Sequence, residues 1–229
     1  LLFLFIFGSG LAPVMSNLGG GQIDFRQFMF PGILGMTVLF TSIFSAVSVV
    51  WDREFGFFKE VMVAPVSRVA VALGKVAGGA TVAMIQGAVI LLLSPLLGIQ
   101  MTFFQIISLL GIMLLLASMM TSLGILIAAR QRSMEGFQMI MNFLLMPMFF
   151  LSGAFFPLND LPLWMTVLTR VDPVAYGVDP LRYMTLQNTV PNQALEMLSR
   201  HPVGINLLFM LGFMVIFLVP AVWLFSKRD

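Results

Sequence analysis

One short segment, residues 50–68, carries the side chains best suited to recognition or chemistry. Its sequence, VWDREFGFFKEVMVAPVSR, holds six of the chain's 12 basic and 10 acidic residues. These six are Asp52, Arg53, Glu54, Lys59, Glu60 and Arg68. Aromatic residues lie between the charges, and an aromatic anchor ringed by charge is typical of a surface that docks a soluble partner.

The same segment has the period of an amphipathic helix. At about 100° per residue, one apolar stripe consists of Trp51, Phe55, Phe58 and Met62. The opposite face consists of Arg53, Phe57 and Glu60. Pro65 ends the predicted helix, and Ser67 can cap the next one. Amphipathicity alone leaves two interpretations open: a helix lying on the lipid surface, or a docking helix anchored by Phe57.

Catalytic and metal-binding groups are scarce. The chain has no cysteine, so it has neither a thiolate metal site nor a cysteine nucleophile, and its single histidine, His201, cannot form a ligand cluster. The run LGGGQ at residues 18–22 is rich in glycine, but no Gly-x-x-x-x-Gly-Lys-Ser/Thr motif for phosphate binding occurs. We therefore expect a chain that is not an enzyme and that holds no cofactor or metal itself.

Composition indicates which solvent the chain meets. Apolar residues make up 59% of the sequence and charged residues 10%, against about 45–50% and about 25% in soluble domains. These values indicate an integral membrane protein. The net charge is +2, but the charges are scattered between apolar runs and cannot build the basic surface that binds nucleic acid.

Long uncharged runs predict six membrane-spanning helices, because one span needs about 20 apolar residues. The run at residues 76–129 is long enough for two spans, with a turn at Ser94-Pro95 and Gly98. The predicted spans are residues 1–14, 30–50, 69–93, 104–129, 137–156 and 204–225. The runs are continuously apolar rather than alternating, which favours helices over a β-barrel. We therefore predict one all-α integral membrane domain over residues 1–229, with an amphipathic helix in the loop at residues 51–66.

Basic residues predict the orientation of these spans. Eight of the twelve lie after the second span, after the fourth span and in the C-terminal tail: Arg53, Lys59, Arg68, Lys75, Arg130, Arg132, Lys227 and Arg228. The positive-inside rule predicts that these segments and both termini are cytoplasmic. Lys75, about two turns into the third span, can extend to the membrane surface. The chain begins inside an apolar run, so we expect residues before Leu1 to be missing.

The connection at residues 157–202 is too apolar at its start for a free loop. Asp160 can cap a helix with Pro162 in its first turn, and that helix is too short to span the membrane. It is predicted to be a re-entrant or interfacial helix on the outer side. Asp179-Pro180 predicts the start of a second short helix running to Gln187, which places the external helices within residues 158–190.

Two spans carry candidates for a substrate pathway. A polar stripe in the second span consists of Thr37, Thr41, Ser45 and Ser48. The candidates in the fifth span are Asn142, Met146, Phe149 and Phe150. Two interpretations remain open: these residues line a central cavity between two copies of the chain, or they pack helices together, as small and hydroxyl residues commonly do.

Two stretches resemble the permeases of the ABC-2 exporter family. WDREFGFFKEVMVAPVSRVAVALGKVAGGA is similar to the segment after the family's second span, with its acidic-basic-acidic-x-Gly run and Pro-Ser/Thr-Arg turn. LMPMFFLSGAFFPLNDLPLWMTVLTRVDPVAYGVDPLR is similar to the fifth span and the external helices after it. With six spans in matching order, the resemblance covers nearly the whole chain. The amphipathic helix that usually precedes the family's first span is absent from the sequence given.

The resemblance implies a permease subunit that dimerises with a second copy or a paralogue in the plasma membrane of a prokaryote. Cytoplasmic ABC ATPase subunits would hold the ATP and Mg²⁺, and residues 51–66 would form the coupling helix. The residues expected at that interface are Asp52, Arg53, Glu54, Phe57, Lys59, Glu60 and Arg68. The expected external gate consists of Phe156, Trp164 and Tyr176. The implied cargo is amphipathic or hydrophobic: a drug, a lipid or a lipid-linked saccharide.

Two other classes of protein remain as alternatives. An ion-coupled secondary transporter usually needs a carboxylate, histidine or charged relay inside the membrane, and the interiors of the predicted spans lack one. A membrane scaffold subunit that transports nothing is not excluded by the chemistry of the residues.

Overall fold

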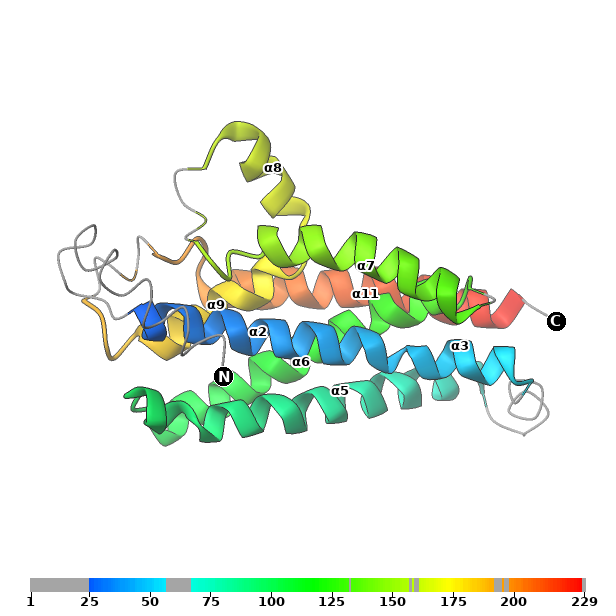
Figure 1. Ribbon diagram of the computed structural model, residues 1–229, viewed down its shortest axis with the longest axis horizontal. Coiled ribbons are helices and arrows are strands. Elements are labelled where there is room, and N and C mark those ends of the chain that lie inside the picture. Colours follow the sequence, from blue (N-terminus) through cyan, green and yellow to red (C-terminus); the bar gives the residue numbers. More distant parts are fainter. Residues whose placement is uncertain are drawn as a thin grey trace.

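The computed structural model describes residues 25–56, 67–131, 133–156, 158, 161–191, 195 and 198–227 (Figure 1). Its elements in these ranges are helical, with no strand in the described part of the chain. They are α2 (Phe25–Ser45), α3 (Val47–Glu54), α5 (Arg68–Leu92), the short 3₁₀ helix η1 (Ser94–Leu97), α6 (Phe103–Ala128), α7 (Met134–Leu151), α8 (Leu163–Val171), α9 (Ala175–Leu186) and α11 (Val203–Lys227). The predicted all-α class is confirmed for these residues.

In the described part of the chain, five stretches of helix are long and apolar enough to cross a membrane. They are Gln27–Asp52, Arg68–Leu92, Phe103–Ala128, Met134–Leu151 and Val203–Leu224. These correspond to predicted spans two to six. The predicted first span, residues 1–14, lies outside the described residues.

Local signals in the sequence set several helix ends. Ser67 caps α5 by accepting a hydrogen bond from the backbone N–H of Ala70, as predicted. Thr102 and Gln105 form a reciprocal capping box at the start of α6. Between these two spans, η1 contains Pro95 and ends at Gly98, whose φ of +74° suits a residue without a Cβ. The predicted turn between spans three and four is therefore present.

The second span is longer than predicted, and it is interrupted. Helix α2 ends at Ser45, and α3 continues after a turn at Ala46. The sequence predicts that a separate amphipathic helix begins at Trp51, whereas residues 51–54 form the last turn of α3. Gly56, at a φ of +82°, then interrupts the predicted helix, because a right-handed helix requires a negative φ. Residues 57–66 lie outside the described residues.

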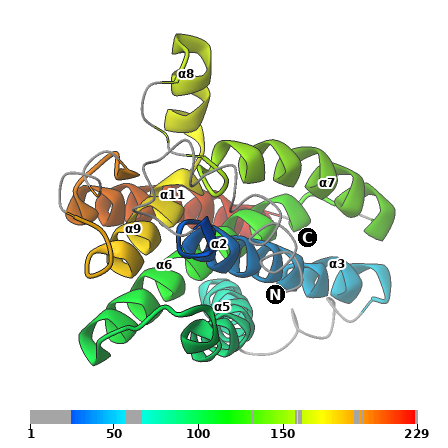
Figure 2. The same cartoon turned by 60° about the vertical axis from the view of Figure 1, so that its left-hand side comes forward.

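Helix α6 is the central element of the bundle. It packs against α2, α5, α9 and α11, and α2 also packs against α5 and α9. The two views of the chain show α8 projecting away from the other helices (Figures 1 and 2). Helix α7 packs mainly against α3 and α8 rather than against α6, so it is a peripheral element of the single chain.

The bundle has two different ends (Figure 1). One end contains α3, the start of α5, the connection from α6 to α7 and the end of α11. The opposite end contains η1, α8 and α9. Helix α9 begins at Ala175 rather than at the predicted Asp179. The buried Asp179 carboxylate instead accepts hydrogen bonds from the residues that lead into α11, so it is not a helix cap.

Candidate functional site

An open groove lies between α2, α3 and α5 and has a volume of about 860 Å³. Its walls are mostly apolar, with hydroxyl groups on the side of α2 and α3 and with an amine and an amide on the side of α5. Its lining consists of Phe40, Thr41, Phe44, Ser45, Ser48, Val71, Gly74, Lys75, Gly78, Gly79, Val82 and Gln86. A groove of this composition suits a molecule or a helix that is apolar over most of its surface.

The predicted polar stripe of the second span lies largely in this groove. The Thr41 hydroxyl donates a hydrogen bond to the Gln86 side-chain oxygen on α5. The Ser45 hydroxyl donates to the Ser42 carbonyl oxygen at 2.6 Å. Thr37 donates instead to the Ile33 carbonyl oxygen at 3.0 Å and does not line the groove. The Thr41 hydroxyl therefore joins α2 to α5. The hydroxyls of Ser45 and Thr37 form hydrogen bonds within α2 instead.

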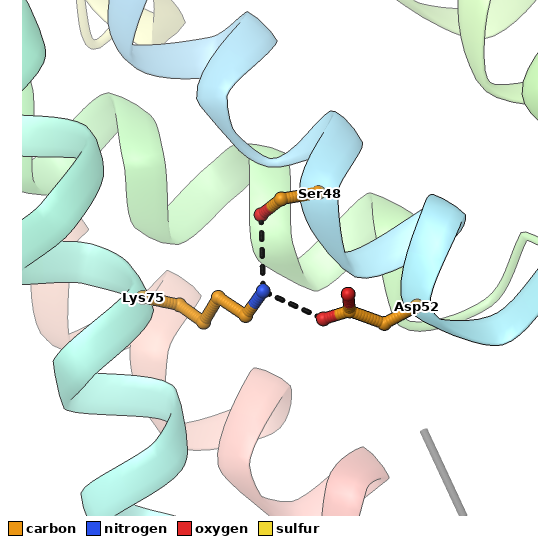
Figure 3. Close-up of polar contacts among 3 residues, drawn as sticks. All are labelled: Ser48, Asp52 and Lys75. Atoms are coloured by element: carbon orange, nitrogen blue, oxygen red, sulfur yellow. Dashed lines mark hydrogen bonds and ion pairs between the residues drawn. The ribbon is translucent and has the colours of Figure 1, made fainter. Parts of the chain in front are cut away.

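Lys75 forms the charged part of the groove (Figure 3). Its Nζ atom lies 2.6 Å from Asp52 Oδ2 and 3.2 Å from Ser48 Oγ. Lys75 therefore bridges α5 to the end of the second span. Sequence reasoning missed this pair. Asp52 does follow Thr41, Ser45 and Ser48 at helical spacing, so the stripe itself was the available signal.

Glycines explain how closely α5 approaches its neighbours. A Cβ at Gly79 would overlap Ser45 Oγ and come within 2.7 Å of Thr121 Cγ2 on α6. Gly74 and Gly78 are different, because a Cβ at either position would have no described atom within 4 Å. The adjacent glycines thus have separate roles. Gly79 permits helix contact, and Gly74 and Gly78 keep the groove open.

Three of the predicted coupling residues have described side chains. Asp52 pairs with Lys75, and Arg68 is the first residue of α5. Glu54 Oε2 accepts a hydrogen bond from the backbone N–H of Met134, the first residue of α7, at 3.3 Å. Arg53 belongs to α3, but its side chain lies outside the description. Phe57, Lys59 and Glu60 lie outside the described residues altogether.

The four candidates on α7 do not form one surface with the groove. Asn142, Met146 and Phe150 are exposed on the single chain, whereas Phe149 is buried. The Phe149 ring packs 6.0 Å from that of Phe40, which lines the groove, and 5.0 Å from that of Phe150. Aromatic contact therefore connects α7 to one edge of the groove, and the other side chains face outward.

The three predicted gate residues lie near the end that holds α8 and α9 and occupy different environments. Phe156 is half-buried just beyond the end of α7. Trp164, on the projecting helix α8, is 65% exposed. Tyr176 is buried in α9, where its hydroxyl donates to the Arg170 carbonyl oxygen at 2.8 Å and its ring lies 4.7 Å from that of Phe209. Among the residues that the structure describes, the Tyr176 ring packs against His201, Phe209 and Phe213 rather than against Phe156 or Trp164.

A buried polar cluster at the same end was not predicted. Asp179 accepts hydrogen bonds from the backbone N–H groups of Arg200 and His201, and from Asn206 Nδ2 at 2.8 Å. This carboxylate ties α9 to the start of α11. The available signal was the position of Asp179 on an apolar helix, because a buried carboxylate requires hydrogen-bond donors.

A second buried charge, Arg182, joins α9 to the end of α7. Its Nη2 atom donates to the carbonyl oxygens of Gly153 and Ala154, and its guanidinium lies 4.4 Å from the centroid of the Phe28 ring. The planar guanidinium suits both contacts. These interactions attach α9 to the end of α7. They also bury the Arg182 side chain, which has no exposed surface for a ligand.

Asp172, in the connection from α8 to α9, is also buried. Loss of hydration raises the pKa of its carboxyl to about 8, although a hydrogen bond from the Val174 N–H opposes the rise. Its Oδ2 atom has no hydrogen-bond partner among the described residues. No group of three or more potential metal ligands occurs in the described part of the chain.

Comparisons with known proteins give the family context. The model of the ABC-2 type transporter family matches residues 1–186. A putative transport permease, ycf38, of Cyanophora paradoxa is 29% identical over 187 residues, which cover 80% of this chain and 64% of that protein. The chain thus spans less than two thirds of that relative's length.

Two further relatives are bacterial proteins, one a transport permease and the other a nodulation protein. The inner membrane transport permease YadH of Escherichia coli K12 is 26% identical over 83% of this chain and 74% of that protein. Nodulation protein J of Rhizobium leguminosarum bv. trifolii is 25% identical over 83% of this chain and 72% of that protein. Given the family match and the helices of spanning length, this chain is a multi-pass membrane protein that belongs to the ABC-2 type transporter family.

Proposed function

We propose that this chain is the non-catalytic transmembrane subunit of an ATP-driven exporter in the plasma membrane of a prokaryote. The observation that carries the proposal is the gathering of charged connections at one end of the bundle. The start of the charged segment, the α6–α7 connection and the end of α11 all lie there (Figure 1). The positive-inside rule makes that end cytoplasmic, where soluble ABC ATPase subunits carrying ATP and Mg²⁺ can dock.

The coupling surface in this proposal is the segment that follows α3. Asp52, Glu54 and Arg68 lie at its two edges, and Arg53, Phe57, Lys59 and Glu60 belong to it by sequence. Membership of the ABC-2 type transporter family supports an ATPase partner. With a first span at residues 1–14, both termini of the unit are cytoplasmic.

The proposed cargo is amphipathic or hydrophobic, such as a drug, a lipid or a lipid-linked saccharide. The support is the lining of the groove, where aromatic and aliphatic walls lie beside hydroxyl and amide groups that include those of Thr41 and Ser45. Asn142 supports a dimer. Its amide is exposed on a spanning helix of the single chain, and an unpaired amide in hydrocarbon costs roughly several kcal/mol. A second permease copy or a paralogue would cover it.

Reconstitution with an ABC ATPase encoded beside the permease gene tests the proposal. Tagged permease should retain that ATPase through purification in detergent and should change its rate of ATP hydrolysis in proteoliposomes. A catalytically dead ATPase should remain bound and show no hydrolysis. An ATPase that neither binds the permease nor responds to it contradicts the proposal.

Ion-coupled transport is the second candidate, and the Lys75–Asp52 pair is the observation that favours it. This pair places titratable groups inside two stretches of spanning length. The sequence prediction put Lys75 in the third span but left Asp52 in the loop after the second span. The two functions differ in their energy source. Uptake of an amphipathic dye into vesicles should require ATP and survive a protonophore if the exporter proposal holds, whereas gradient-driven uptake without ATP supports the second candidate.

A further inference from the structure

Helix α3 is a two-turn helix with a backbone interruption at each end. At its start, Ala46 lies in a turn where its N–H donates to the Ile43 carbonyl oxygen at 3.1 Å. At its end, Gly56 adopts a φ of +82°. Hydroxyl groups of Ser42 and Ser45 bond to backbone carbonyls just before the first interruption, and such bonds commonly bend helices. Helix α3 is therefore separated from α2 by a turn of one residue.

The first interruption packs directly against the central helix. A Cβ at Gly124 of α6 would lie 2.9 Å from both Ala46 Cβ and the Ile43 carbonyl oxygen. The backbones of α2 and α6 thus meet where α3 begins, with no side chain of residue 124 between them. This contact places the start of α3 directly against α6.

Two acidic side chains attach the far end of α3 to two different spans. Asp52 pairs with Lys75 of α5 at 2.6 Å, and Glu54 accepts a hydrogen bond from the N–H of Met134 at 3.3 Å. That N–H belongs to the first turn of α7, where backbone donors have no partner within the helix and the helix dipole favours a negative charge. The attachments therefore point to opposite neighbours, α5 and α7.

We infer that α3 is a transmission element in which Asp52 and Glu54 are positioning residues that couple movement of the charged segment to α5 and α7. The inference rests on the proposed function, because it assumes that a partner moves that segment. Asp52 and Lys75 are each about 30% exposed at their side chains, and exposed ion pairs are weak enough to break and re-form. A weak ion pair can break and re-form in each transport cycle, whereas a permanent attachment would need a stronger contact.

Distance measurements test the attachments without any ATPase. The chain has no native cysteine, so spin labels at introduced cysteines are unambiguous. A label at Phe55 paired with one at Met139 reports the distance from α3 to α7, and a label at Phe55 paired with one at Leu73 reports the distance from α3 to α5. All three side chains are exposed.

Each attachment should respond to its own variant. Glu54→Ala should broaden or shift only the α3–α7 distance distribution, and Asp52→Asn should broaden or shift only the α3–α5 distribution. Reversing the pair, with Asp52→Lys and Lys75→Asp together, should restore the narrow α3–α5 distribution. Glu135→Ala is the matched control, since Glu135 is an exposed acidic residue in the same first turn of α7. Unchanged distributions in both single variants overturn the inference.

Measurements of ATPase activity distinguish residues that transmit movement from residues that only stabilise the fold. In Asp52→Asn and Glu54→Ala, the permease-dependent change in the ATPase rate, measured per bound ATPase, should fall by about two- to fivefold, the scale of one exposed ion pair. The reversed pair should recover most of the response. A response equal to wild type in both single variants, measured per folded permease, contradicts transmission. If wild-type permease binds no ATPase, the proposed function fails, and the distance measurements still decide the attachments.

Discussion

Asp172 shows how one buried carboxyl sets a pH dependence. Burial raises the pKa of this group from 3.8 to about 8, so the folded chain holds a proton that the unfolded chain releases near pH 4. Below pH 4 the carboxyl is protonated in both the folded and the unfolded chain, so it does not make the free energy of unfolding depend on pH. As the pH rises from 4 to 8, the unfolded state ionises first, and the folded state loses stability relative to it.

We predict that Asp172→Asn stabilises the folded chain at pH 8 by a few kcal/mol relative to wild type and gives little difference at pH 4. The amide keeps an oxygen for the Val174 N–H and cannot ionise. Unfolding followed by tryptophan fluorescence in detergent, at a series of pH values, measures the difference. A difference between the two proteins that does not vary with pH contradicts the raised pKa.

At the scale of elements, neighbouring glycines on α5 make a matched pair. Gly79→Ala should destabilise the bundle by about 1–3 kcal/mol, because the added methyl overlaps Ser45 and Thr121 and the helices must separate. Gly78→Ala should have no such cost, since a Cβ at that position meets open space. Thermal unfolding of the two variants under one set of detergent conditions provides the comparison, and equal melting temperatures would exclude a close crossing at Gly79.

Helix α8 offers a second prediction at this scale, which depends on the proposed exporter function. Its Trp164 is exposed on a helix that lies at the opposite end of the bundle from α3 (Figure 1). If α8 closes the outer end of the pathway, Trp164→Ala should leave ATPase binding and basal hydrolysis intact and should alter only the substrate-stimulated rate. A parallel fall of basal and stimulated rates, normalised to folded protein, would indicate a membrane anchor instead.

For the whole molecule, the two ends of the bundle define a topology prediction. Single cysteines at Gln131, in the α6–α7 connection, and at the exposed Asn188, just after α9, lie at opposite ends. An impermeant thiol reagent should label Asn188→Cys in intact cells or spheroplasts and Gln131→Cys only in inverted vesicles. Labelling of both positions from the same side contradicts the proposed orientation.

The sequence predicts most of the bundle because its local signals are strong. Ser67 and the apolar run after it specify the start of α5, and Pro95 with Gly98 specifies the turn after that span. The interrupted second span was not predicted, because no proline or glycine marks the turn at Ala46. That turn packs against Gly124 of a distant helix. Residues of the site that depend on partners far along the chain, such as Lys75 with Asp52 and Asp179 with Asn206, were likewise missed.

The Lys75–Asp52 pair also bears on how the chain enters the membrane during synthesis. A lysine in a spanning helix opposes insertion, by up to about 2.5–3.5 kcal/mol where it lies at the bilayer centre, and Lys75 lies within the spanning stretch of α5, about two turns from its start. Its counter-charge, Asp52, is synthesised earlier, at the end of the preceding span. The nascent second span must therefore remain beside the insertion site until α5 emerges, and the two spans are expected to enter the bilayer as a hairpin whose charges are already paired.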